Sequence, residues 1–79
     1  MNELARAIYE ARKDGDSITA NIRLKKNGHF SSISGKVEDL KVSRDGFPYA
    51  VVRKGKNDYQ NVRLDNVLSV TKGDWVYWK

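Results

Sequence analysis

The first segment of the chain carries apolar side chains at the spacing i, i+3, i+4 and i+7, which places them on one stripe of a helix. These side chains are Leu4, Ala7, Ile8 and Ala11. Asn2 is a suitable N-cap for this helix. Asp14-Gly15 supplies its end, because glycine readily adopts the left-handed conformation that terminates helices. We therefore expect a helix over residues 2–13, lying across one open end of a sheet.

From Ser17 onward the apolar period changes to two, which is typical of a half-buried strand. The apolar positions are Ile18, Ala20, Ile22 and Leu24. Asn27-Gly28 follows this strand and strongly favours a hairpin with a two-residue type I′ turn. Such a turn pairs Leu24 with Ser31 and Ile22 with Ile33, so that apolar residues of both strands share one face.

The same pairing places Phe30 on the opposite, outer face, beside Lys25. The alternative is that Phe30 packs into the core, because large aromatic side chains usually dominate cores. Gly35 falls in the interior of the second strand, where glycine marks a sharp bend or a close approach of two backbones.

Two more hairpins are predicted further along the chain. We expect a two-residue turn at Asp45-Gly46 and a four-residue connection at Gly55-Lys56-Asn57-Asp58. Both choices place the same six side chains on the inner face, which are Leu40, Val42, Tyr49, Val51, Val62 and Leu64. The outer face then carries Lys41, Ala50, Val52, Lys54, Tyr59, Asn61 and Arg63. This agreement between two independent turns is the main support for the predicted core.

A short strand over residues 67–70, a turn at Lys72-Gly73-Asp74 and a last strand over residues 75–78 complete the chain. The 79 residues therefore predict one domain, residues 1–79, of the mainly β class. Its helix precedes a five- to six-stranded antiparallel meander over residues 17–78. Closure of this meander into a small barrel would remove the aggregation-prone edges of an open sheet.

Two segments resemble the Sm-like (LSm) family. Ile22-Arg23-Leu24-Lys25-Lys26-Asn27-Gly28 is similar to the first strand and turn of that family. Val62-Arg63-Leu64-Asp65-Asn66-Val67-Leu68-Ser69-Val70 is similar to its second motif, although Leu64 stands where the family has glycine. The Asp and Met-Asn signature of its first motif, which grips uridine-rich RNA, has no clean counterpart in residues 38–49. Over residues 18–70 the resemblance implies a small SH3-like barrel, and through the family also RNA binding and ring assembly.

The charge balance favours a polyanionic partner. Lys and Arg number 15 against 10 Asp and Glu, which gives a formal charge of +5. Each phosphate that a cation neutralises releases condensed counterions. Charge that serves solubility alone is the alternative. The chain has no cysteine, no run of about 20 apolar residues and no basic leader, so we expect a cytoplasmic protein without a membrane partner.

The residue types needed for catalysis are poorly represented. His29 is the only histidine, so a histidine-rich metal site is excluded. No nucleophile motif surrounds Ser31, Ser32 or Ser34. Adjacent carboxylates on a strand, such as Glu38 and Asp39, point to opposite faces. We expect a protein that is not an enzyme and that has no cofactor and no metal.

Two binding hypotheses remain. The first is nucleic-acid binding, to RNA or DNA, through the phosphate backbone and with little sequence specificity. Its candidate residues are Arg23, Lys25, Lys26, Phe30, Lys41, Tyr59 and Arg63. For Lys41, Tyr59 and Arg63, the alternative is that they form a charged face that only contacts solvent.

The second hypothesis is a protein–protein interaction module or an inhibitory accessory module, which binds a protein partner or a second copy of itself. The small size of the chain would also suit a protein encoded by a phage or a mobile element. The candidate residues for this module are Trp75, Tyr77 and Trp78, because tryptophan and tyrosine dominate interface hot spots. Trp75 and Tyr77 share one face of the last strand, and Val76 and Trp78 share the other. One of these pairs is expected to close the barrel.

Overall fold

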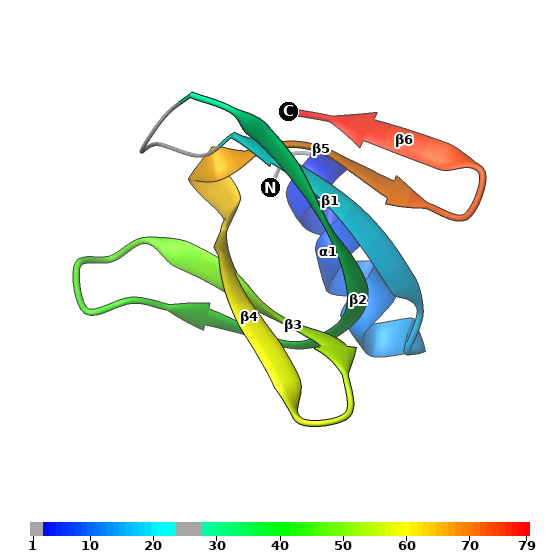
Figure 1. The fold of residues 1–79 in the computed structure, drawn as a ribbon, viewed down its shortest axis with the longest axis horizontal. Helices are drawn as coiled ribbons and strands as arrows, with labels where there is room; N and C mark the ends of the chain where they lie inside the picture. Colours follow the sequence, from blue (N-terminus) through cyan, green and yellow to red (C-terminus); the bar gives the residue numbers. More distant parts are fainter. Residues whose placement is uncertain (1–2, 24–27) are drawn as a thin grey trace.

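The computed structural model describes residues 3–23 and 28–79, and in this part of the chain one helix accompanies a six-stranded antiparallel sheet (Figure 1). The elements are α1 (Glu3–Asp14), β1 (Ser17–Arg23), β2 (Phe30–Val42), β3 (Pro48–Gly55), β4 (Asp58–Arg63), the 3₁₀-helix η1 (Leu64–Asn66), β5 (Val67–Lys72) and β6 (Trp75–Trp78). The strands lie in the order β4-β3-β2-β1-β5-β6. The predicted mainly β class is confirmed.

Helix α1 packs its apolar stripe into the core. All four predicted side chains are buried, and they are Leu4, Ala7, Ile8 and Ala11. The helix lies against β1, β2, β5 and β6. It ends at Asp14, followed by Gly15 with φ of +73°, which confirms the predicted stop. The proposed cap, Asn2, lies outside the described residues.

The sheet is curved but open. Among the described strands, β4 and β6 are two edges that do not pair with each other, so the expected closure into a barrel is not found. Helix α1 lies against the inner face. Its buried Leu4 and Ile8 join the same core cluster as the inner side chains of the strands. The sheet therefore curls around the helix, and it buries its inner face without closing on itself.

The first hairpin has the predicted faces in a different register. Ile22 lies opposite Ser31 and Ala20 opposite Ile33, two residues from the predicted pairing. Because side chains alternate with period two, a shift of two residues keeps every side chain on its expected face. Ile18, Ala20, Ile22, Ile33 and Val37 are accordingly buried. Leu24 and Asn27, on which the predicted turn depends, lie outside the described residues.

Strand β3 is turned over relative to the prediction. Ala50 and Val52, expected on the outer face, are buried in the core, and Val52 is only 1% exposed. Tyr49 and Val51, expected inside, alternate with them and are only partly buried. The inward assignment of Tyr49 and Val51 is therefore wrong.

The cause is a loop that is one residue longer than expected. Ser43 N–H donates to the Phe47 carbonyl at 2.8 Å, and Gly46 N–H donates to the Ser43 carbonyl at 2.9 Å. Gly46 has φ of +87°. A three-residue loop of this kind, a tight turn followed by a left-handed glycine, is common in hairpins. The extra residue reverses the parity of β3.

The pairing of β3 with β4 is also shifted by one residue from the predicted pairing, and this second shift restores the predicted faces of β4. Gly55 lies opposite Asp58, so the turn holds two residues, and the register shifts between Arg53 and Gly55. Val62 is therefore buried, as predicted. Leu40 and Leu64 are partly buried against the core. Val42, predicted inside, is exposed because it forms the last pair of the β2–β3 ladder, opposite Pro48.

Gly35 lies where two backbones meet. A Cβ atom at this position would be 2.2 Å from the Arg53 carbonyl oxygen, a separation that real Cβ atoms do not reach. The predicted close approach is therefore confirmed. Near this point β2 leaves β1 and continues beside β3, with a register irregularity between Val37 and Asp39.

The parity of β3 can be tested with two isosteric substitutions. Val52→Thr places a hydroxyl in the core without a partner and should lower the free energy of unfolding by about 1–3 kcal/mol. Val51→Thr is the matched control on the outer face and should change it by less than about 0.5 kcal/mol. Urea denaturation measures both. A larger loss for Val51→Thr would contradict the observed register.

Candidate functional site

The face of the sheet that points away from α1, here called the outer face, is rich in small hydroxyl groups over β1, β2, β5 and β6. Its alternating side chains are Thr19, Asn21, Arg23, Phe30, Ser32, Ser34, Ser69, Thr71, Val76 and Trp78. Two large aromatic side chains on this face are open to solvent, Phe30 at 73% and Trp78 at 69% exposure. The polar centre of this face is therefore flanked by exposed rings.

Hydrogen bonds between side chains hold the centre of the outer face in place. The Ser32 hydroxyl donates to Asn21 Oδ1 at 2.9 Å, and Asn21 Nδ2 donates to Ser69 Oγ at 2.9 Å. The Thr19 and Ser34 hydroxyls lie 2.9 Å apart. Ser69 is only 3% exposed, whereas Ser32 and Ser34 are open to solvent. The network thus links one buried hydroxyl to exposed ones.

Phe30 and Arg23 form the last described pair of the β1–β2 ladder. The register is regular through Ser31 and Ser32, so no bulge turns Phe30 inward. The predicted outward orientation of Phe30 is confirmed, and its packing into the core is excluded by its exposure. Lys25 and Lys26, the other candidates on this hairpin, lie outside the described residues.

The other predicted cations lie on the outer face of β2, β3 and β4. Lys41 is opposite Tyr49, which is opposite Arg63, so these three residues form one row across the strands. Lys36, Arg53 and Tyr59 form a second row. Lys41, Tyr59 and Arg63 therefore point outward, as predicted.

Tyr49, Lys36 and Arg53 are neighbours of this set that the sequence pattern did not predict. Tyr49 points outward because the loop before β3 is one residue longer than the predicted turn. The signal was present in Ser43-Arg44-Asp45-Gly46, because serine at the first position and glycine at the fourth are typical of a type I turn.

Two arginines of this face already form ion pairs with carboxylates. Arg53 Nε lies 3.0 Å from Glu38 Oε1. Arg63 Nη2 lies 2.6 Å from Asp65 Oδ2, and its guanidinium carbon is 4.1 Å from the centre of the Phe47 ring.

Two lysines on the outer face of β2 remain for an external anion. Among the described residues, Lys36 and Lys41 take part in no ion pair. The carboxylate of Asp39, which lies between them along β2, is 3.3 Å from Arg12 Nη2. The Arg12 guanidinium therefore offsets the negative charge of the Asp39 carboxylate between Lys36 and Lys41.

The structure does not gather the predicted nucleic-acid residues into one compact cluster. Phe30 is the first residue of β2, and Lys41 is its second to last. The outer side chains of β2 connect these two ends through Ser32, Ser34 and Lys36. The candidate site is therefore a track along one bent strand.

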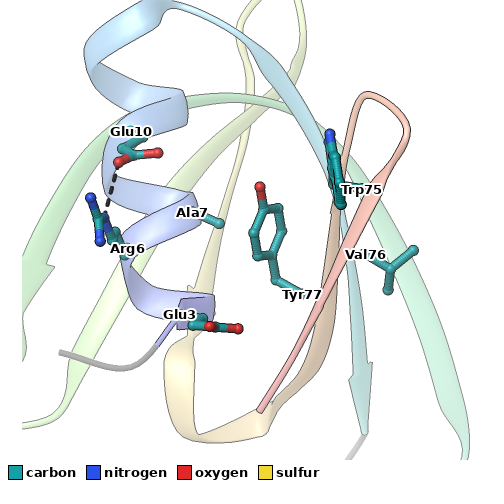
Figure 2. A pocket seen from close by; sticks show the side chains of 7 residues that line it. All are labelled: Glu3, Arg6, Ala7, Glu10, Trp75, Val76 and Tyr77. Carbon is teal, nitrogen blue, oxygen red and sulfur yellow. Dashed lines mark hydrogen bonds and ion pairs between the residues drawn. The ribbon is translucent and has the colours of Figure 1, made fainter.

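The aromatic residues of β6 divide between two faces. The predicted alternation is confirmed, because Val76 and Trp78 share the outer face while Trp75 and Tyr77 lie on the side of α1. Neither pair closes a barrel, and Trp75 is 70% exposed. Trp75 and Tyr77 line a hollow of about 570 Å³ between β6 and α1 (Figure 2).

Residues 3–23 and 28–79 contain neither a metal-ligand cluster nor a helix that could span a membrane. No group of three or more His, Cys, Asp or Glu side chains there is placed to hold a metal ion. The helix in these residues is too short and too polar to cross a bilayer.

Comparison of the chain with protein-family models, with curated protein sequences and with solved structures gives no match.

The network on the outer face predicts a measurable coupling. Asn21→Ala leaves the buried Ser69 hydroxyl without its partner and should lower the free energy of unfolding by about 1–2 kcal/mol. Ser69→Ala should lower the free energy of unfolding less in the Asn21→Ala protein than in the native protein, because it removes a buried hydroxyl that has already lost its hydrogen-bond partner. Denaturant unfolding of both single variants and the double variant completes the cycle. Strict additivity would show that the bond contributes nothing.

Proposed function

We propose that the protein is a non-enzymatic domain that binds single-stranded nucleic acid on its outer face, mainly through the phosphate backbone and with little sequence preference. The observation that carries this proposal is the exposed ring of Phe30 opposite Arg23, on the same face as Lys36 and Lys41. Aromatic side chains beside cations are how small β domains hold unpaired bases.

The exposed rings supply the stacking component. Phe30, Tyr59 and Trp78 all lie on the outer face, and each is more than half exposed. A base that stacks on such a ring gains about 1–3 kcal/mol, and every base offers a suitable face. Stacking therefore gives affinity without demanding a particular sequence.

The side chains of β2 supply the backbone component. Lys36 and Lys41 are free of ion pairs among the described residues and can neutralise phosphates. Ser34 lies on the same side of β2 and shares one hydrogen bond with Thr19, so one of these two hydroxyls keeps a proton that it can donate to a phosphate oxygen. A single strand that follows β2 would meet a ring, then hydroxyls, then cations.

We further propose that the fold is an open variant of the small SH3-like or Sm-like barrel. The N-terminal helix, the bent second strand and the pairing of β1 with both β2 and β5 support this assignment. Fold alone does not fix function, so the proposal of nucleic-acid binding depends on the outer face.

Titration of a labelled single strand at several salt concentrations tests the proposed function. Affinity should fall as salt rises, and Lys41→Gln should reduce the slope of log K against log salt by about 0.7, the value for one phosphate contact on a single strand. Lys13→Gln, on the exposed end of α1, removes the same charge away from the outer face and should leave the slope unchanged. Phe30→Ala should weaken binding by about 5- to 150-fold with no change in slope. No binding at low salt, or equal effects of both lysine variants, would refute the proposal.

The two tryptophans give a second test, because they lie on different sides of β6. In a Trp75→Phe protein the remaining Trp78 reports on the outer face, and a single-stranded oligonucleotide should quench its fluorescence by stacking. In a Trp78→Phe protein the remaining Trp75 faces α1 and should be unaffected. Quenching of Trp75 without quenching of Trp78 would show that the nucleic acid binds on the side of α1, and it would contradict the proposal.

A further inference from the structure

A groove between α1 and β6 has the opposite chemistry to the outer face. Its volume is about 570 Å³, and it is lined by Glu3, Ala7 and Glu10 from the helix and by Trp75 and Tyr77 from the strand. Figure 2 shows Tyr77 pointing from β6 toward Ala7, whereas Val76 points away. The groove thus combines two aromatic rings with carboxylates.

The charge around this groove is negative in a protein of net positive charge. A second hollow, lined by Asp16, Lys72 and Asp74, shares Trp75 and Tyr77 with it. With Asp14, which pairs with Lys72, the two hollows gather five carboxylates and two cations, a formal charge of −3. The whole chain carries +5.

The cations of these hollows already have partners. Arg6 pairs with Glu10 at 3.1 Å, and Lys72 lies 3.8 Å from Asp14 and 3.9 Å from Asp16. Among the described residues, Glu3 and Asp74 take part in no ion pair. The groove therefore has negative charge available for a cation from outside.

The free edge of β6 borders the same groove. Lys72 and Trp75 flank a two-residue turn, and Lys79 N–H donates to the Leu68 carbonyl at 3.1 Å. In an antiparallel ladder, hydrogen-bonded pairs alternate with pairs whose backbone groups point away. The backbone N–H and C=O groups of Val76 and Trp78 therefore point toward the free edge.

We propose that this edge and groove bind an extended segment of a partner protein in which alternate residues are Lys or Arg. The segment adds to β6 as a further strand, with main-chain hydrogen bonds to Val76 and Trp78. Every second side chain then points to the side of Trp75 and Tyr77, where a cation meets aromatic faces and carboxylates. A second copy of this chain fits less well, because edge-to-edge pairing would bring two acidic grooves together.

Fluorescence of the Trp78→Phe protein, in which Trp75 is the remaining tryptophan, tests the proposal. A short peptide that alternates Lys with Thr should change this signal and should bind more tightly than a peptide that alternates Glu with Thr. Glu3→Gln combined with Asp74→Asn removes the two carboxylates that have no ion pair among the described residues, and should weaken binding of the Lys peptide by about 2- to 30-fold, the effect of two exposed ion pairs.

Val76→Pro supplies a test of the strand edge. Proline removes a backbone N–H that points away from the ladder, a position where edge strands tolerate it. It should abolish peptide binding, while circular dichroism and the urea midpoint show that the fold is kept. Val76→Thr is the matched control, because it keeps the N–H, and it should bind the peptide normally.

Three results would overturn this inference. They are equal binding of the Lys and Glu peptides, no binding of either peptide, and sedimentation of the protein as a dimer that Val76→Pro dissociates. None of them bears on the proposed nucleic-acid site, whose readouts are the salt dependence and Trp78. Failure of one proposal is therefore distinguishable from failure of the other.

Discussion

The packing of the apolar stripe of α1 into the concave face of the sheet is the interaction on which this fold depends. A helix of 12 residues has little stability alone, and an open sheet without it would expose one apolar face to water. Leu4 and Ile8 are among the most deeply buried side chains of the described residues and join the inner side chains of the strands in one core. Because the helix covers the inner face, the sheet has no need to close, and its outer face and the β6 edge remain open.

The bend of β2 determines how the outer face is laid out. One strand of 13 residues serves both halves of the sheet, and it can do so because Gly35 admits the Arg53 carbonyl at a distance that no side chain would tolerate. Phe30 and Lys41 lie near opposite ends of this bent strand, so the candidate residues form a track along it. A feature required for packing thereby fixes the shape of the proposed binding surface.

The two proposed surfaces differ in charge although they share β6. The outer face offers rings beside cations with few free carboxylates, while the groove offers rings beside carboxylates whose cations are already paired. The alternation of side chains along a strand produces this division, because Val76 and Trp78 point one way and Trp75 and Tyr77 the other. A polyanion and the side chains of a basic peptide would therefore meet opposite faces of the same strand.

The sequence by itself determined the helix, its buried stripe and the faces of β1 and the first part of β2. These features follow from the local spacing of apolar residues, which has a period of about 3.6 in a helix and 2 in a strand. The sequence left open whether Phe30 points outward or into the core, and whether Gly35 marks a bend or a close approach, and the structure decided both. Only the tertiary structure decided the parity of β3, because two turn lengths that differ by one residue are both compatible with Asp45-Gly46, and the choice depends on whether Val51 or Val52 fills the core. Closure was likewise decided by packing, since whether a sheet curls around itself or around a helix depends on contacts between residues far apart in the chain. The neighbours of Lys41, and the choice of Trp75 and Tyr77 as the β6 pair that lies on the side of α1, follow from those long-range contacts.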